Sequence, residues 1–170
     1  NKVAFNGRAD FGEVRFSHDS HFSHATFAGE ADFSKTEFHA WSRFNSSRFA
    51  SPMTFANANF RGSANFADVE FAGDVEFGKA RFIAYADFQR SRFRGRAQFQ
   101  NASIECKTLF REAVFTEPVD FTDCRFTHPV NFASARFNAA ATFDRVVMLQ
   151  FVDFSKAHIS DAFLLSSPKG

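Results

Sequence analysis

The chain has 170 residues, the size of one ordinary domain, and carries 28 Phe against one Trp and one Tyr. Its charges balance, with 20 Lys and Arg against 19 Asp and Glu, for a formal net charge of +1. This balance excludes a strongly acidic or strongly basic protein whose partner would follow from overall charge. The sequence has no run of 18 apolar residues and no signal peptide, and its two cysteines are too few for a disulfide framework or a Cys-rich zinc site.

These features predict a chain without a membrane span. They do not specify a compartment, although a soluble, cytoplasmic protein is slightly favoured. Because the sequence begins with Asn1 rather than Met, we expect an excised domain or a processed product of a longer chain.

The Phe residues follow a grid whose spacing alternates between six and five residues, as in Phe5, Phe11 and Phe16. From Phe5 to Ile159 the grid has 29 positions, of which Phe occupies 26 and Ile or Met the other three. A small or β-branched residue precedes nearly every grid position by two, as Ala9 precedes Phe11. Residues two apart lie on the same side of an extended chain. Each unit is therefore predicted to form a short strand in which the small residue and the Phe both face inward. Gly and Pro mark the corners between steps.

A helical supercoil is the other structure that an 11-residue period can indicate. At about 100° per residue, steps of five and six would put Phe on two separate stripes of a helix instead of one seam. Gly or Pro also interrupts most of the chain. We therefore expect extended chain throughout.

The charged residues indicate how many units complete one coil. Residues one coil apart in a stacked β-solenoid lie about 4.8 Å apart, so opposite charges should recur at that offset. At offset 22 there are nine opposite-sign pairs and one like-sign pair, Asp10 and Asp32, whereas offset 11 gives seven opposite against eight like. The nine pairs are Arg8–Glu30, Glu13–Lys35, Arg15–Glu37, Arg48–Glu70, Asp68–Arg90, Glu70–Arg92, Asp74–Arg96, Arg90–Glu112 and Asp123–Arg145. The sequence therefore predicts a four-sided coil of about 22 residues, about seven coils and a core filled with Phe.

The repeated unit, exemplified by Ala9-Asp10-Phe11 and Ala31-Asp32-Phe33, resembles that of the pentapeptide-repeat family. The resemblance extends from Val3 to about Ile159 and implies an all-β, right-handed quadrilateral β-helix. Two features depart from the family pattern. Every second unit has six residues, which should widen two of the four corners, and the middle position is often Arg, Glu or Thr instead of Asp or Asn.

Three of the four aromatic residues outside the grid, Trp41, Tyr85 and Phe151, fall on one corner column. They are separated by multiples of 22 residues, so they should align along the solenoid. An exposed row of aromatic side chains would anchor a protein partner. The alternative is that these rings fold over the edge of the wide corners.

The C-terminal segment differs from the repeats because it places apolar residues at outward positions. These are Val147, Leu149, Phe163, Leu164 and Leu165. We expect the β-helix to occupy residues 1–160 and a cap or tail to occupy residues 161–170. A homodimer interface is the other interpretation of this end, and the family resemblance suggests it too.

Candidate chemical groups are few. In the 22-residue register His39 lies near His18 and Asp19, which would permit a surface metal site, although solvated corner residues are the ordinary interpretation. Cys124 occupies the inward small-residue column, where we expect a buried, inert thiol, and Cys106 falls on a corner as a free thiol.

The charged surface offers two further candidates. The stacked pair Asp10 and Asp32 resembles a close carboxylate pair on a mildly acidic side, although two ordinary exposed acids are the simpler interpretation. The arginines at 90, 92, 94 and 96 form a basic ring that could contact a phosphate backbone, but neighbouring acids offset it, so nucleic-acid binding is not expected.

No catalytic or nucleotide-binding motif is present. We therefore expect a non-enzymatic solenoid, without cofactor or metal, that serves as a protein–protein interaction or structural module. The resemblance implies an alternative, a DNA mimic that binds a type II topoisomerase such as DNA gyrase. That activity requires a long acidic rod, and the net charge of +1 argues against it.

Overall fold

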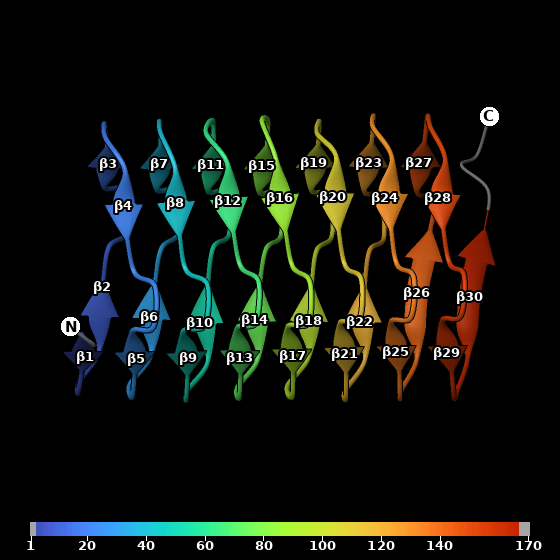
Figure 1. Cartoon of the computed structure of the whole chain (residues 1–170), viewed down its shortest axis with the longest axis horizontal. Helices are drawn as coiled ribbons and strands as arrows, with labels where there is room; N and C mark the ends of the chain where they lie inside the picture. The colour runs from blue at the N-terminus through green and yellow to red at the C-terminus, as the bar shows by residue number, and fades with distance from the viewer. Residues whose placement is uncertain (1–2, 167–170) are drawn as a thin grey trace.

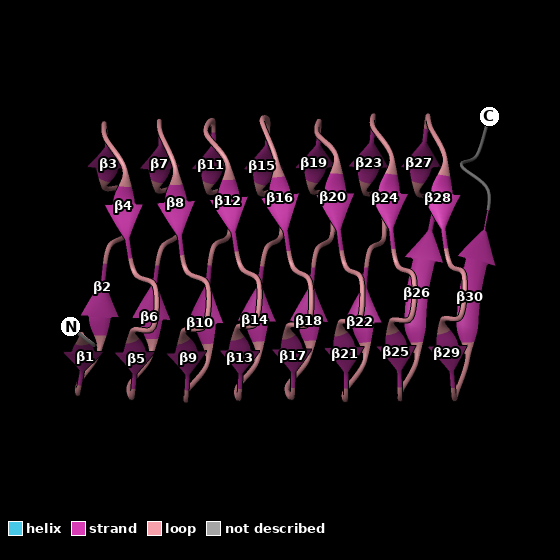
Figure 2. Cartoon of the chain, viewed as in Figure 1, coloured by secondary structure: helices cyan, strands magenta, loops and turns pink. Residues whose placement is uncertain are grey.

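A computed structural model describes residues 3–166, which form strands joined by short turns and bends (Figure 2). The coils stack along the long axis, with the N-terminal strands at one end and the C-terminal strands at the other (Figure 1). Consecutive strands belong to different sheets, and each strand pairs in parallel with strands one coil away. The all-β solenoid predicted from the Phe grid is confirmed.

Four parallel sheets form the four sides. The first sheet consists of β1 (Ala4–Phe5), β5 (Thr26–Phe27), β9 (Arg48–Phe49), β13 (Glu70–Phe71), β17 (Arg92–Phe93), β21 (Val114–Phe115), β25 (Arg136–Phe137) and β29 (His158–Ile159). The second sheet consists of β2 (Ala9–Asp10), β6 (Ala31–Asp32), β10 (Met53–Thr54), β14 (Val75–Glu76), β18 (Ala97–Gln98), β22 (Val119–Asp120), β26 (Ala141–Asp144) and β30 (Phe163–Ser166).

The other two sheets have one strand fewer each. The third sheet consists of β3 (Arg15–Phe16), β7 (Glu37–Phe38), β11 (Asn59–Phe60), β15 (Arg81–Phe82), β19 (Ser103–Ile104), β23 (Arg125–Phe126) and β27 (Val147–Met148). The fourth sheet consists of β4 (Ser20–His21), β8 (Ser42–Arg43), β12 (Ala64–Asn65), β16 (Ala86–Asp87), β20 (Thr108–Leu109), β24 (Val130–Asn131) and β28 (Val152–Asp153). The described residues thus make seven coils and half of another.

The strand register confirms the 22-residue coil. Phe5 pairs with Phe27 in the first sheet, and Arg15 pairs with Glu37 in the third. The Phe grid therefore builds continuous columns, one Phe above the next.

The two unit lengths make two kinds of corner. Each five-residue unit closes with a tight turn, in which, for example, the Val14 amide donates to the Phe11 carbonyl oxygen at 3.2 Å. The third residue of each such turn has a positive φ, as at Glu13 with 60°, which is the geometry of a type II turn. The six-residue units instead pass through an open bend. This difference agrees with the expectation that the longer units give wider corners.

Among residues 3–166 no glycine has a positive φ, so the glycines at the bend corners serve close packing and not the left-handed conformation. At the bend corners a Cβ on Gly62 would lie 2.2 Å from the Ala40 carbonyl oxygen of the preceding coil, and one on Gly29 would lie 2.6 Å from the Gly7 backbone. Such contacts are too short for any side chain, so these corners require Gly.

The core consists of Phe columns flanked by small residues. Rings one coil apart stack nearly parallel, as Phe60 and Phe82 do with 4.7 Å between centroids, and rings of adjacent columns meet edge-on, as Phe66 and Phe77 do at 5.5 Å. The twelve largest fully buried side chains are all Phe. Small residues such as Ala58, which is fully buried, fill the space beside them. Because the interior is filled in this way, it offers no room for a ligand.

Asp and Asn have a structural role at the middle position of the units that precede a tight turn. The Asp120 carboxylate accepts the Thr122 amide at 2.7 Å, and the Asn131 side-chain oxygen accepts the Ala133 amide at 2.7 Å. These hydrogen bonds belong to the second and fourth sheets, whose strands lead into tight turns. Strands of the first and third sheets lead into open bends, so Arg and Glu are accepted there, which explains one of the two departures from the family pattern.

The charge ladder was predicted correctly in part. Four of the nine expected pairs form ion pairs, namely Lys35–Glu13, Arg48–Glu70, Arg90–Asp68 and Arg145–Asp123. Within the described part of the chain, the other five expected pairs, Arg8–Glu30, Arg15–Glu37, Glu70–Arg92, Asp74–Arg96 and Arg90–Glu112, form no ion pair. In two of them a side chain takes another partner, because long side chains also reach beyond the residue one coil away. Arg8 contacts Asp10 and Asp32 instead of Glu30, and Glu70 takes Arg94 at 2.7 Å instead of Arg92.

At the C-terminal end the ladder continues through Ser166. Within the segment expected to be a cap or tail, β30 pairs with β26, with Phe163 opposite Ala141. The Phe163 ring lies 5.0 Å from that of Phe143 and 5.7 Å from that of Phe154, so it covers the last Phe layer. Residues 167–170 of the same segment lie outside the described residues.

Candidate functional site

The corner that precedes the fourth sheet carries the aromatic column expected from the sequence. Its members are Trp41, Ser63, Tyr85, Lys107, Pro129 and Phe151, each one residue before a strand of that sheet. Backbone hydrogen bonds join consecutive coils along this column. The Ala64 amide donates to the Tyr85 carbonyl oxygen of the next coil at 2.8 Å, and the Val130 amide donates to the Phe151 carbonyl oxygen at 3.1 Å. The three aromatic residues therefore lie on one line parallel to the long axis.

Trp41 is exposed yet held in place. Its side chain is 52% exposed, and the Arg43 guanidinium lies 4.8 Å from the ring centroid in a cation–π contact. The Asp19 carboxylate accepts the Trp41 amide at 3.2 Å and forms an ion pair with Arg43 at 3.0 Å. His21 completes the cluster through a ring nitrogen 3.1 Å from Arg43. We call Trp41, Asp19, Arg43 and His21 the Trp41 cluster.

The other two aromatic side chains differ in exposure. Phe151 is 72% exposed, the largest value among the exposed apolar residues, whereas Tyr85 is half-buried. Burial, reinforced by the nearby Asp87 carboxylate, raises the pKa of the Tyr85 hydroxyl. Tyr85 thus lies partly over the edge of its corner, and Trp41 and Phe151 project from theirs.

The apolar C-terminal surface is also present. Leu149, Leu164 and Leu165 are exposed, Val147 is half-buried, and Phe163 packs inward onto the last Phe layer. That this surface mediates homodimerisation stays a prediction, which sedimentation velocity of the wild type and of a Leu164→Lys/Leu165→Lys variant would test.

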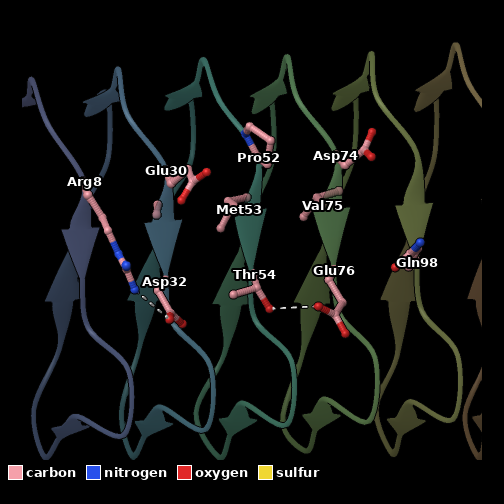
Figure 3. A pocket seen from close by; sticks show the side chains of 11 residues that line it. Arg8, Glu30, Asp32, Pro52, Met53, Thr54, Asp74, Val75, Glu76 and Gln98 are labelled. Atoms are coloured by element: carbon pink, nitrogen blue, oxygen red, sulfur yellow. Dashed lines mark hydrogen bonds and ion pairs between the residues drawn. The ribbon is translucent and has the colours of Figure 1, made fainter.

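The second sheet bears an open depression of about 330 Å³ on its outward side (Figure 3). Arg8 lies 3.7 Å from the Asp32 carboxylate, and the Thr54 hydroxyl donates to Glu76 at 3.3 Å (Figure 3). Asp10 and Asp32 are strand partners, but each carboxylate also accepts the amide of a tight turn. Their oxygens are engaged by the backbone and by Arg8, so this pair is arranged for structure and not for acid–base chemistry.

The histidines and acids considered for a metal site have separate partners. His39 Nε2 lies 2.7 Å from Glu37, and Asp19 belongs to the Trp41 cluster. Among the described residues, no three His, Cys, Asp or Glu side chains gather closely enough to hold a metal ion.

Both cysteines are buried and free. Burial raises the pKa of the Cys106 thiol to about 11 and that of the Cys124 thiol to about 12. The Cys124 thiol donates to the Phe99 carbonyl oxygen at 2.8 Å. Cys106 does occupy a corner, as expected, but it is only 3% exposed. Nucleophilic chemistry requires the thiolate, so neither residue is suited to it.

The basic ring is matched by acids at two of its four arginines. Arg90 makes two hydrogen bonds of 2.8 Å to Asp68, and Arg94 lies 2.7 Å from Glu70. The Arg96 amide donates to the Asp74 carboxylate at 2.9 Å. The guanidinium groups of Arg90 and Arg94 are therefore paired with carboxylates, and those of Arg92 and Arg96 form no ion pair with the described residues.

Comparison with known families agrees with the repeat analysis. A family model described as pentapeptide repeats (9 copies) matches residues 44–92, 55–103 and 88–134. Together these matches cover residues 44–134, more than half of the chain. The chain belongs to the pentapeptide-repeat family. No curated protein and no solved structure matches it in the same comparisons.

Pentapeptide-repeat proteins are generally non-catalytic, which agrees with the filled interior of this solenoid. In residues 3–166 we find no helix of the length and apolar character that crossing a membrane would require. In this pentapeptide-repeat protein the exposed corner before the fourth sheet is the candidate functional site.

Proposed function

We propose that this solenoid is a non-catalytic interaction module that binds a protein partner along the corner before the fourth sheet. Trp41 and Phe151 are the exposed anchors, and Tyr85 supplies a partly covered contact between them. The observation that carries the proposal is the Trp41 cluster, in which the Arg43 guanidinium lies over a half-exposed indole and Asp19 binds both Arg43 and the Trp41 backbone amide.

Large aromatic side chains and arginines dominate the binding energy of protein interfaces. A side chain already held in one position loses less conformational freedom on binding, so more of its contact energy contributes to affinity. The Trp41 cluster meets both conditions, because it joins an indole and a guanidinium, and Asp19 holds the guanidinium over the ring and the Trp41 backbone amide in place.

The dimensions of the corner also suit a protein partner. Trp41 and Phe151 are five coils apart, which corresponds to about 24 Å at about 4.8 Å per coil. An interface of standard size buries about 800 Å² on each partner and easily spans such a distance. A small molecule would not reach both anchors.

A topoisomerase-binding DNA mimic is the alternative that we do not propose. Such a mimic needs rows of free carboxylates, whereas Asp10, Asp32 and Asp120 on the most acidic side accept turn amides. We expect no inhibition of DNA gyrase supercoiling at micromolar protein, and inhibition at that concentration would favour the mimic.

The test is quantitative affinity capture with immobilised wild type, a Trp41→Ala/Tyr85→Ala variant and a Lys107→Ala control. Lys107 is exposed in the same corner column, so its removal changes the corner without removing an aromatic contact. A specific partner should be recovered by the wild type and the control and lost by the double variant. Equal recovery by all three, with unchanged circular dichroism, would contradict the proposal.

A further inference from the structure

The last two coils of the first sheet present six polar side chains in two rows. Each row begins with a tight-turn residue, Ser134 or Lys156, continues with a strand residue, Arg136 or His158, and ends with the residue that follows the strand, Asn138 or Ser160. The rows are joined by the strand pair Arg136 and His158 and lie about 4.8 Å apart. They line an open depression of about 640 Å³ formed by Ser134, Arg136, Asn138, Lys156, His158 and Ser160.

Every one of these six side chains can donate a hydrogen bond, and none is a carboxylate. Arg136 and Lys156 are permanently cationic at neutral pH, and His158 becomes cationic when protonated. Arg136, Lys156 and His158 are exposed. In the part of the chain that the structure describes, no carboxylate lies within ion-pairing distance of Arg136 or Lys156.

The same face of the first sheet carries charges of both signs in the three preceding coils. There a depression of about 440 Å³ is lined by residues of both signs, including Asp68, Glu70 and Arg92. Each acid of this earlier depression faces an arginine, as Asp68 faces Arg90 at 2.8 Å. The earlier coils thus accommodate cations on this face by placing carboxylates beside them. The two rows that contain Arg136 and His158 have no such carboxylate.

Like charges in neighbouring rows of a sheet repel one another, so Arg136 beside Lys156 lowers stability unless an anion lies between them. The ring of donors around these cations, from Ser134 and Asn138 in one row and Ser160 in the other, suits a tetrahedral oxyanion. A guanidinium binds two phosphate oxygens at once, an ammonium adds a point charge, and hydroxyl and amide donors reach the remaining oxygens.

We propose that this depression, the C-terminal anion groove, binds a phosphate group as its dianion, whether free or as a phosphomonoester. Arg136 is the bidentate donor, Lys156 the second charge, and Ser134, Asn138 and Ser160 the neutral donors. Because the groove is open to solvent, binding is expected in the millimolar range at low salt and to weaken as salt rises.

The proposal is tested by NMR titration of the full 170-residue chain with inorganic phosphate, O-phosphoserine and serine at constant ionic strength. We expect saturable amide shifts confined to residues 134–138 and 156–160 with both phosphate-bearing probes and none with serine. A tighter response to inorganic phosphate identifies the free anion as the preferred ligand, and a tighter response to O-phosphoserine identifies a phosphorylated side chain.

Two variants make the test specific. Arg136→Gln/Lys156→Gln should weaken the affinity for inorganic phosphate about tenfold or more, because each substitution removes a charge-assisted hydrogen bond. Arg92→Gln, on the same face amid acids, should leave it unchanged. The proposal is overturned if no shift saturates, or if Arg92→Gln weakens binding as much as the double substitution does. All three positions are exposed, and an unchanged melting temperature without phosphate confirms that the variants fold.

Discussion

Phe77 offers the sharpest test of the aromatic core. Its side chain is fully buried and stacks between Phe55 and Phe99, with ring centroids 5.1 and 4.8 Å away. Replacing a buried Phe by Ala costs about 3–5 kcal/mol through lost burial and the cavity left behind. Stacked pairs add about 0.5–1.5 kcal/mol each beyond burial, so we place Phe77→Ala at the upper end, near 5 kcal/mol. For a chain of this size that corresponds to a fall of about 10–20 °C in melting temperature.

The measurement is urea unfolding followed by circular dichroism, with two companion variants. Phe77→Leu keeps most of the volume and should cost about 1–1.5 kcal/mol, which isolates the aromatic contribution. Phe151→Ala removes the same side chain from a site that is 72% exposed, and should change the free energy of unfolding by less than about 0.5 kcal/mol. If Phe77→Ala costs less than about 1 kcal/mol, or no more than Phe151→Ala, then the stacked columns do not stabilise the solenoid as argued.

Three further outcomes are expected. Gly62→Ala should destabilise the protein by about 1–3 kcal/mol, because the new Cβ would lie 2.2 Å from the backbone of the preceding coil. Gly78→Ala should be neutral or slightly stabilising, because its Cβ would lie 3.4 Å from a flexible side chain. Thermal unfolding of the two variants compares them. Cys124 should resist iodoacetamide at pH 8 in the native protein and react on unfolding, since its pKa is raised to about 12; rapid labelling of the native state would contradict its burial. The hydrogen bond from Arg90 lowers the pKa of Asp68 below its value in the unfolded chain. The ionised Asp68 carboxylate therefore stabilises the fold above about pH 4, and this stabilisation is lost as the pH falls. Acid titration of Arg90→Gln should therefore show a smaller loss of stability below pH 4 than the wild type does.

The repeat explains why the fold was predictable. Phe at steps of five and six cannot be buried on one face of a helix, and the opposite charges at offset 22 leave only a four-sided coil. The pairing of Phe5 with Phe27 follows directly, because a one-residue slip would turn every Phe outward. The corners were less predictable, since the positive φ values fall on residues such as Glu13 and on no glycine of the described part of the chain.

The candidate site was only partly predictable. The sequence placed Trp41, Tyr85 and Phe151 on one corner column, but it left open whether the rings project or fold over the edge. Exposure depends on the depth of each bend and on neighbours such as Arg43 over the Trp41 ring, which the repeat pattern does not encode. The C-terminal anion groove went unnoticed although its residues were readable, because the signal was an absence of acids in its own two rows, which contain Arg136 and His158.

The amino-acid sequence alone determined the period, the inward direction of the grid residues and the identity of the core, since residues two apart on an extended chain face the same side. The three-dimensional structure decided which charges meet and which donors remain unmatched. Glu70 binds Arg94 on the diagonal because flexible side chains choose partners by distance in space and not by register. Similarly, Asp120 caps a turn while Glu37 pairs with His39, because only the local backbone determines whether an amide is presented to the carboxylate.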